Sequence, residues 1–243
     1  MIDNNNYDNL TYKEHNARDF DGYIWINMNG EKQLATLNLV KGNNVYGEKL
    51  ILYKKEEYRL WDPFRSKLAA SLLKGLQDFP IKKGLKILYL GASTGTTISH
   101  ISDIIGNTGV IFAVESSMRV ARELLENVAD KRENIIPIIE DARKPNLYFS
   151  TYGEVDIVYC DIAQPDQTDI AISNCYRFLK DQGKILLVIK TRSIDVTQDP
   201  KNVIIQESEK LQNNSFTIEQ ILTLEPYDKD HGLIQATYNQ IKS

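Results

Sequence analysis

The sequence predicts an α/β fold in which a mainly parallel sheet follows a small antiparallel β domain. Apolar, β-rich runs alternate with helical segments through most of the chain, the order that a parallel sheet requires. One of these runs breaks into a glycine turn and restarts as a helix. Before residue 59, short β-like runs are instead separated by turn signals. We therefore divide the chain into residues 1–58 and 59–243.

The first part begins with a polar segment, residues 1–11, which is rich in asparagine and which we expect to be mobile. Turn signals at Asn29-Gly30 and Lys41-Gly-Asn-Asn44 separate the β-like runs that follow. Such runs predict a small antiparallel sheet. They are Tyr23–Ile26, Leu34–Leu37 and Leu50–Tyr53.

The second part opens at Asp62-Pro63, which resembles a helix N-cap followed by proline at the first helical position. The expected helix runs to about Leu76, and its apolar side consists of Phe64, Leu68, Leu72 and Leu76. Strands and helices then alternate, and an antiparallel pair closes the chain. The first expected strand begins at Lys86, and the later helices run from Asp166 to about Leu179 and from Pro200 to about Gln212. The other expected strands are Val110–Val114, Ile135–Ile139, Val155–Cys160, Lys184–Lys190, Phe216–Leu224 and His231–Tyr238.

The glycine turn indicates a nucleotide cofactor. Gly91 and Gly95 let the backbone come close to a ligand, while Thr96 and Thr97 can offer hydroxyls and amides at the helix N-terminus. A dehydrogenase loop would read G-x-G-x-x-G, whereas this one reads G-x-x-x-G, the looser form of S-adenosylmethionine-dependent methyltransferases. Glycine turns also occur for purely geometric reasons. Together with the strand order, however, the loop predicts the Rossmann-like, seven-stranded methyltransferase sheet.

Polar residues end four of the expected strands, and the carboxyl ends of parallel strands share one ligand crevice. Glu115 stands twenty residues beyond Gly95, where an acid can accept both ribose hydroxyls. Asp141 would face the adenine, whose exocyclic amine needs an acceptor, and Asp161 would lie near the reacting methyl. The expected cofactor residues are Gly91, Ala92, Gly95, Thr96, Thr97, Glu115, Ser116, Asp141, Ala142, Asp161, Ile162, Ala163 and Gln164.

Composition argues against several other classes of protein, among them membrane, secreted and metal-binding proteins. A chain of 243 residues with 42% hydrophobic content can bury a core. No apolar run approaches the ~20 residues of a membrane span and the N-terminus lacks signal-peptide features, so we expect a cytoplasmic protein without membrane contact. Cys160 and Cys175 suit reduced core thiols. The three histidines do not fall at metal-ligand spacings, so we expect no metal.

The formal net charge of -4 argues against a protein that grips nucleic acid unaided through broad phosphate neutralisation. If the substrate is RNA, partners must supply much of the affinity. A local basic cluster remains open to two interpretations, a solvated face or an RNA-facing surface. Its members are Lys54, Lys55, Arg59, Arg65 and Lys67.

Six motifs closely resemble those of archaeal fibrillarin-like proteins, the methyltransferase subunit of box C/D guide-RNA particles. The likeness runs in order from about residue 17 to the end of the chain. Small departures occur at Ser93-Thr94, at Ser116, where an aromatic is usual, and at Gly232. The motifs are Tyr58–Leu68, Tyr89–His100, Asn134-Ile-Ile-Pro137, Asp161-Ile-Ala-Gln-Pro165, Lys190–Thr197 and Leu224–His231.

This resemblance implies guide-directed ribose 2′-O-methylation of rRNA and tRNA, with S-adenosylmethionine as donor and S-adenosylhomocysteine as product. It implies box C/D guide RNA and target RNA as ligands, a scaffold protein that docks this chain, and a kink-turn-binding protein related to ribosomal proteins. Base pairing with the guide would choose the nucleotide. The cell would be archaeal, without a nucleus.

The resemblance also assigns Lys67, Asp161, Lys190 and His231 to the catalytic group. Methyl transfer from a sulfonium is an in-line displacement with an activated donor, so the enzyme mainly aligns the acceptor and handles its proton. Lys190 can hold the 2′-oxygen, Asp161 can orient that ammonium, and the other two would flank them. Lys67 could instead be a surface lysine and His231 a strand-edge histidine. For His100 a packing or capping role is favoured.

Two other functions would require different residues. Amino-methylation of adenine usually places Asp/Asn-Pro-Pro-aromatic where this chain has Asp161-Ile-Ala-Gln164. A non-catalytic scaffold that retains the cofactor fold would predict damage among Lys67, Asp161 and Lys190, and all three are intact. The sequence therefore favours an enzyme, with the scaffold subunit as the alternative.

Overall fold

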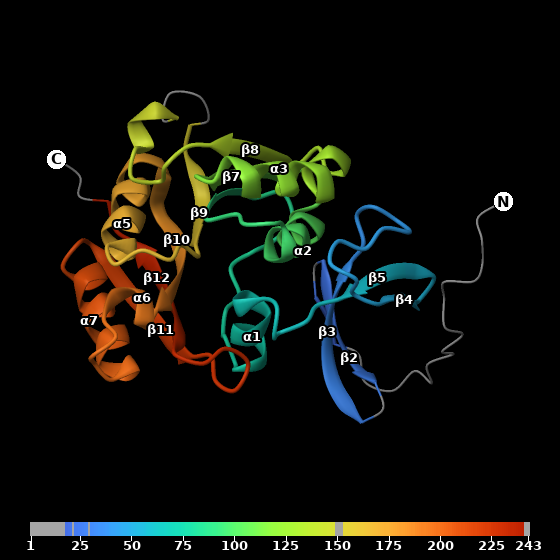
Figure 1. The fold of residues 1–243 in the computed structure, drawn as a ribbon. Helices are drawn as coiled ribbons and strands as arrows, with labels where there is room; N and C mark the ends of the chain where they lie inside the picture. The colour runs from blue at the N-terminus through green and yellow to red at the C-terminus, as the bar shows by residue number, and fades with distance from the viewer. Residues whose placement is uncertain (1–17, 21, 29, 149–152, 241–243) are drawn as a thin grey trace.

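The computed structural model describes residues 18–20, 22–28, 30–148 and 153–240 (Figure 1). Residues 1–11, which we expected to be mobile, and His15 lie outside these ranges. Within them the chain forms a five-stranded sheet of order β1-β2-β3-β5-β4 and a seven-stranded sheet of order β11-β12-β10-β9-β6-β7-β8. The predicted fold class is confirmed.

The small sheet is antiparallel throughout, as predicted. Two of its strands were not predicted, β1 and β5. In β5 the sequence Glu-Glu-Tyr-Arg-Leu lacks an obvious apolar alternation, and the turn before it is formed by Lys54 and Lys55, both with positive φ, rather than by Asn-Gly. The strands are β1 (Arg18–Phe20), β2 (Tyr23–Met28), β3 (Glu31–Leu37), β4 (Leu50–Tyr53) and β5 (Glu56–Leu60).

The large sheet pairs β10-β9-β6-β7-β8 in parallel, and β12 runs antiparallel between β10 and β11. Every strand predicted for this sheet is present. Only β10 differs markedly, since it begins at Leu179 and includes a register irregularity before Lys184. The strands are β6 (Lys86–Leu90), β7 (Val110–Glu115), β8 (Ile135–Ile139), β9 (Val155–Cys160), β10 (Leu179–Lys190), β11 (Phe216–Thr223) and β12 (His231–Tyr238).

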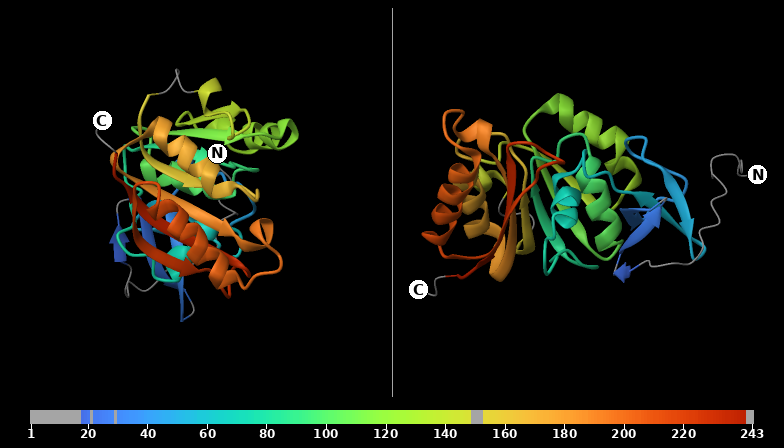
Figure 2. Two further views of the ribbon diagram at one scale, coloured as in Figure 1. Left: turned by 90° about the vertical axis from the view of Figure 1, so that its left-hand side faces the viewer. Right: turned by 90° about the horizontal axis from the view of Figure 1, so that it is seen from below.

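Helices cover both faces of the large sheet (Figures 1 and 2). Alternate strand residues point to opposite faces: Ile87 and Tyr89 pack in the core with α1, α2 and α3, while Leu88 and Leu90 pack with α5 and α7. None of the helices in the described ranges is long and apolar enough to cross a membrane. The helices are α1 (Lys67–Leu73), α2 (Thr96–Ile105), α3 (Met118–Asn127), α5 (Gln167–Phe178), α6 (Thr191–Ile194) and α7 (Pro200–Gln212), with single 3₁₀ turns η2 (Ala129–Lys131) and η3 (Pro145–Leu147).

Helix α1 is shorter than predicted. Its N-cap is Ser66, whose hydroxyl accepts a hydrogen bond from the Ala69 amide at 3.3 Å. Asp62 instead closes a tight turn, because its carboxylate accepts from the Phe64 amide at 2.8 Å. Phe64 therefore lies before the helix with 68% of its surface exposed, and its predicted place on the apolar helix face is wrong.

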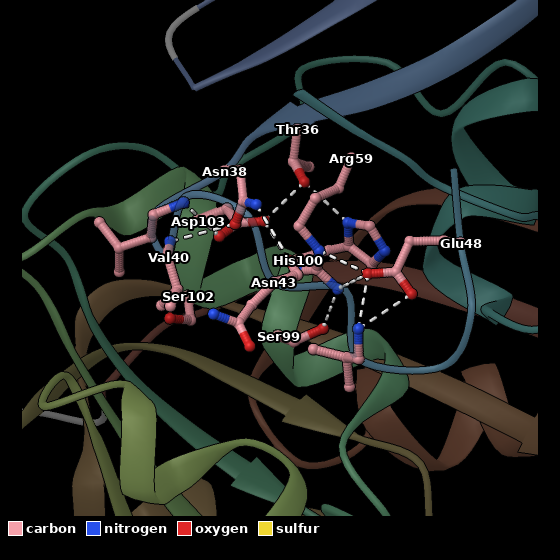
Figure 3. Close-up of polar contacts among 12 residues, drawn as sticks. Thr36, Asn38, Val40, Asn43, Glu48, Arg59, Ser99, His100, Ser102 and Asp103 are labelled. Atoms are coloured by element: carbon pink, nitrogen blue, oxygen red, sulfur yellow. Dashed lines mark hydrogen bonds and ion pairs between the residues drawn. The ribbon is translucent and has the colours of Figure 1, made fainter. Parts of the chain in front are cut away.

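A buried charge cluster joins the small sheet to α2 (Figure 3). Asp103 of α2 accepts hydrogen bonds from Arg59 of β5 at 2.8 Å, from Arg132 at 2.6 Å and from the Thr36 hydroxyl of β3 at 2.8 Å. The side chains of Arg59 and Asp103 are fully buried, and Arg59 also pairs with Glu48 at 2.6 Å. Arg59 thus belongs to the interior, which corrects its assignment to a basic surface cluster.

His100 lies in the same junction, one helical turn from Asp103. Its two ring nitrogens lie 2.7 Å from the hydroxyls of Thr36 and Tyr46, and its ring stacks on Trp61 with centroids 4.9 Å apart. Burial, reinforced by the charges of Arg59 and Arg132, lowers the pKa of His100 well below its usual value. The residue packs inside the molecule as a neutral imidazole, the role that the sequence favoured.

The charge cluster yields a stability prediction. Replacing Arg59 with Met leaves Glu48 without its arginine and Asp103 with one, so the free energy of unfolding should fall by about 3–5 kcal/mol, as for other broken buried ion pairs. Urea denaturation measures this change. Lys41→Ala is the matched control, because its pair with Glu56 is exposed and should contribute less than about 1 kcal/mol. A loss from Arg59→Met no larger than that of the control would contradict the argument.

A second prediction concerns pH. The folded chain excludes a proton from His100 that the unfolded chain binds as the pH falls through about 6.5, so stability from this group is complete above that pH and is lost below it. The urea midpoint should therefore drop between about pH 7 and about pH 5, and His100→Gln should show a shallower drop. Equal slopes in the two proteins would rule out His100 as the source.

Candidate functional site

A cavity of about 320 Å³ opens where β6, β7, β8, β9 and β10 end. This is the convergence of polar strand ends that the sequence predicted. Nine of the thirteen predicted cofactor residues line the cavity: Gly91, Glu115, Ser116, Asp141, Ala142, Asp161, Ile162, Ala163 and Gln164.

The other four, Ala92, Gly95, Thr96 and Thr97, do not line it. The Ala92 amide donates to the carbonyl of Val114 at 3.2 Å, and the Thr97 hydroxyl donates to that of Ser66 at 3.0 Å. Gly95 has a φ of +110°, and a Cβ there would lie 2.2 Å from the Val128 side chain. The structure thus gives this glycine a packing reason, beyond the ligand approach inferred from sequence.

Gly91 serves both the cavity and the chain. Its φ is +82°, and a Cβ would lie 2.7 Å from the carbonyl oxygen of Asp161. The Asp161 amide in turn donates to the carbonyl of Leu90 at 2.9 Å. The absent side chain lets β6 and β9 end in contact, which brings Asp161 to the mouth of the cavity.

Glu115 ties the glycine loop to α3. Its carboxylate accepts from the Ser93 amide at 3.0 Å and from the Ser117 amide at 2.9 Å. Both bonds fix a carboxylate that lines the cavity. An acceptor held in this way can receive the hydroxyls of a sugar without first having to be ordered.

Arg143 is a residue that sequence reasoning missed. Its guanidinium donates to both carboxylate oxygens of Asp166, at 2.7 and 3.0 Å, and to the side-chain oxygen of Gln164 at 2.9 Å. Its amide donates to Asp141 at 2.9 Å. The guanidinium thereby lowers the pKa of Asp166 and links the segments that follow β8 and β9. No local sequence signal pairs Arg143 with Asp166, which lies on another loop.

Beside the cavity, two lysines hold Asp161 between them. The Lys190 ammonium lies 2.9 Å from one carboxylate oxygen and donates to the main-chain oxygen of Asp161 at 3.0 Å. The Lys67 ammonium lies 3.5 Å from the other carboxylate oxygen. All three side chains are at most 21% exposed, so water screens their charges only in part. The structure therefore brings Lys67, Asp161 and Lys190 together, and Lys67 is no isolated surface lysine.

Asp228 completes this cluster and was also missed. Its carboxylate lies 3.7 Å from the Lys67 ammonium and 2.7 Å from Nδ1 of His231. Burial raises the pKa of Asp228, but hydrogen bonds and charge from His231 and Lys67 outweigh it and lower that pKa overall. His231 itself faces Lys190 in the register of β10 and β12. The sequence does contain a signal for Asp228, because this acid stands three residues before His231 within the motif Leu224–His231.

This arrangement can hold an oxygen nucleophile next to a group bound in the cavity. Lys190 and Asp161 belong both to the cluster and to the cavity wall. An ammonium fixed by a carboxylate stabilises negative charge that develops on a nearby oxygen, and it does so best where water is partly excluded. The site therefore suits the transfer of a group to a hydroxyl.

Comparisons with known proteins point to a family of methyltransferases. Residues 13–240 match the family model described as fibrillarin. A protein of Saccharolobus islandicus (strain L.S.2.15 / Lassen #1) described as a fibrillarin-like rRNA/tRNA 2'-O-methyltransferase is 58% identical over 209 residues, which cover 86% of this chain and 90% of that protein.

Two solved structures extend the likeness. A structure of Aeropyrum pernix fibrillarin with natively bound S-adenosyl-L-methionine gives a TM-score of 0.84 at 46% identity and covers 91% of this chain and 98% of that one. The fibrillarin chain of a fibrillarin/Nop5p complex gives 0.78 at 39% identity and covers 89% and 97%. Because the family model spans most of the sequence and the identities are high, the chain belongs to the fibrillarin family.

Proposed function

We propose that this chain methylates ribose 2′-hydroxyls of rRNA and tRNA, using S-adenosylmethionine, as the catalytic subunit of a box C/D guide-RNA particle. The observation that carries the proposal is the lysine pair fixed on Asp161 at the edge of the cofactor cavity. The relative that is 58% identical carries the same activity in its name. An intact reaction cluster argues against a non-catalytic scaffold subunit.

The cavity residues fit the cofactor chemically. Glu115 would receive the ribose hydroxyls, and Asp141 with Ala142 would face the adenine. At one wall of the cavity this chain has Ser116, where an aromatic residue is usual in the family. Gly95, Thr96 and Thr97 would shape the loop from outside the cavity. When bound, S-adenosylmethionine supplies a methyl group already activated on a sulfonium.

The chain's own residues then align the acceptor. Lys190 would hold the 2′-oxygen and stabilise the negative charge that develops as its proton leaves. Asp161 orients that ammonium from one side and anchors Lys67 on the other. Asp228 connects Lys67 to His231, so that all four groups of the predicted catalytic set belong to one connected cluster.

Partners would place the RNA. A chain of net charge -4 gains little from counterion release, so we propose that a scaffold protein docks it and that a kink-turn-binding protein and guide RNA complete the particle in an archaeal cytoplasm. The solved complex of a related fibrillarin with Nop5p supports the scaffold. We propose residues 1–58 and the adjoining surface as the docking domain and 59–243 as the methyltransferase domain, although β5 extends to Leu60.

Radiolabelled methyl transfer tests this function. The isolated chain should bind S-adenosylmethionine yet barely methylate a guide–target duplex at physiological salt. Activity at one ribose should appear when scaffold, kink-turn binder and guide RNA are added. Efficient, site-specific methylation by the chain alone would overturn the dependence on partners, and an inactive complete particle would overturn the enzymatic role.

Cofactor binding should depend on Glu115. Replacing it with Ala removes a charged acceptor, so affinity for S-adenosylmethionine should fall by ~1.5–3 kcal/mol, as expected for hydrogen bonds to a charged group. Isothermal calorimetry on the isolated chain provides the measurement. Glu126→Ala, an exposed acid of α3 that does not line the cavity, should bind normally. Unchanged affinity in a folded Glu115→Ala protein would reject the assignment.

The charge cluster should control the chemical step. Lys190→Ala should lower the single-turnover rate by roughly 10²–10³, the loss typical of one preorganised charge-stabilising donor. Asp228→Asn should lower it less, up to roughly 10², because it only loosens the placement of Lys67 and His231. Cofactor affinity is measured alongside, since Lys190 lines the cavity. A Lys190→Ala particle with a near-normal rate would refute the role.

A further inference from the structure

A second cavity, of about 590 Å³, lies between the small sheet and the reaction cluster. Leu34, Leu60 and Trp61 line it from the small sheet and the linker, and Phe64, Leu73 and Tyr227 from the methyltransferase side. Its volume falls in the range of pockets that bind small molecules or single groups of larger ones. Neither the cofactor nor the reaction chemistry described above uses it.

The Trp61 ring forms part of the wall of this cavity. Its ring is 2% exposed and stacks on His100, while its indole N–H has no hydrogen-bond partner among the described residues. Buried donors in folded proteins are almost always paired, because an unpaired one costs about 1–3 kcal/mol. Here protein atoms enclose the N–H, so a ligand in the cavity does not reach it and Trp61 contributes only ring surface to the wall.

Aromatic rings form the outer wall. Phe64 is 68% exposed, and its ring meets that of Tyr227 edge to face, with centroids 5.3 Å apart. A phenylalanine exposed to this extent adds little to the core. Exposed aromatic rings beside a pocket are the usual means by which proteins stack on unpaired RNA bases.

The aromatic wall adjoins the reacting groups. Phe64 stands three residues before Lys67, and Tyr227 directly precedes Asp228, the two charged residues that pair at 3.7 Å. The charges on the cavity wall are mixed, with Lys32 and Lys49 beside Glu31, Glu48 and Asp62. Mixed charge does not suit a run of phosphates, whereas a pocket with an apolar, aromatic wall suits a base.

We propose that this cavity receives one unstacked base of the target RNA, next to the methylated nucleotide, against the rings of Phe64 and Tyr227. The proposal rests on the proposed function and adds an acceptor-strand subsite to it. Phe64 is then a positioning residue, since it fixes the strand and leaves the reacting atoms to the charge cluster.

Steady-state methylation by the reconstituted particle tests the proposal. Phe64→Ala should raise the KM for the target oligonucleotide by roughly tenfold, the effect of losing one base–aromatic stack, with cofactor affinity unchanged. Phe64→Trp should restore the KM, and Phe64→Leu should not, because leucine is apolar but has no π face. Leu147→Ala is the matched control, as Leu147 is 64% exposed and lines neither cavity. Thermal melts should show all variants folded, since both side chains are exposed.

A second measurement separates a base from a protein ligand. Targets with a single abasic nucleotide at successive positions beside the methylated one should include one that raises the KM of the native particle but not that of Phe64→Ala, the sign of a direct contact. The proposal fails if no position shows this coupling, or if Phe64→Leu equals the native chain. It also fails if Phe64→Ala weakens scaffold binding instead, which would make the cavity a protein-docking site. An inactive native particle would identify failure of the proposed function itself.

Discussion

The buried carboxylate of Asp103 determines how the two sheets meet. It receives arginines from β5 and from the segment after η2, and a hydroxyl from β3, all at hydrogen-bond distance. A buried ion pair adds little net stability, because desolvation offsets most of the attraction. Its consequence here is geometric. Its three partners hold the small sheet against α2 in the arrangement that stacks Trp61 on His100 and shapes the cavity between the sheets. The same helix begins at the glycine loop, so the junction and the cofactor site share one rigid element.

The reaction cluster balances its charges within a small volume. Lys67 and Lys190 oppose Asp161 and Asp228, so that each ammonium is held by a carboxylate and none of the four is buried alone. These groups come from α1, from the ends of β9 and β10, and from the loop before β12. Residues far apart in sequence thus meet because parallel strands end at one edge of the sheet, and β12 runs back from that edge.

Sequence predicted the large sheet well because its strands are buried on both faces and read as apolar runs. It predicted the convergence of Glu115, Asp141 and Asp161 for the same reason, since strand ends are visible where the apolar run stops. The prediction was wrong for residues whose role depends on contacts made in the folded structure. Arg59 looks like a surface charge until Asp103 and Glu48 are placed beside it. Asp62-Pro63 looks like a helix start, yet the Ser66 hydroxyl provides the cap and leaves Phe64 outside.

The same limit explains the missed site residues. Arg143 and Asp228 act through contacts with residues on other loops, which no local spacing reveals. Gly95 was predicted to let a ligand approach the backbone, whereas its steric reason in the structure is contact with Val128, which requires the packed helix α3. The sequence pattern therefore predicts where the backbone turns and where polar residues lie close together. Which residues bond to one another is known only from the folded structure.

The position of β12 has a consequence for biosynthesis. This strand, which follows every other strand of the sheet in sequence, inserts between β10 and β11 and sets His231 opposite Lys190. Chains emerge from the ribosome N-terminus first, so α2, β6 and the cofactor loop can fold while β10 still has one unpaired edge. The nascent protein would therefore hold a cofactor cavity before it holds a complete reaction cluster. The reaction cluster is complete only after β12 has paired with β10, because Asp228 and His231 reach the cluster from the loop before that strand and from its first residue.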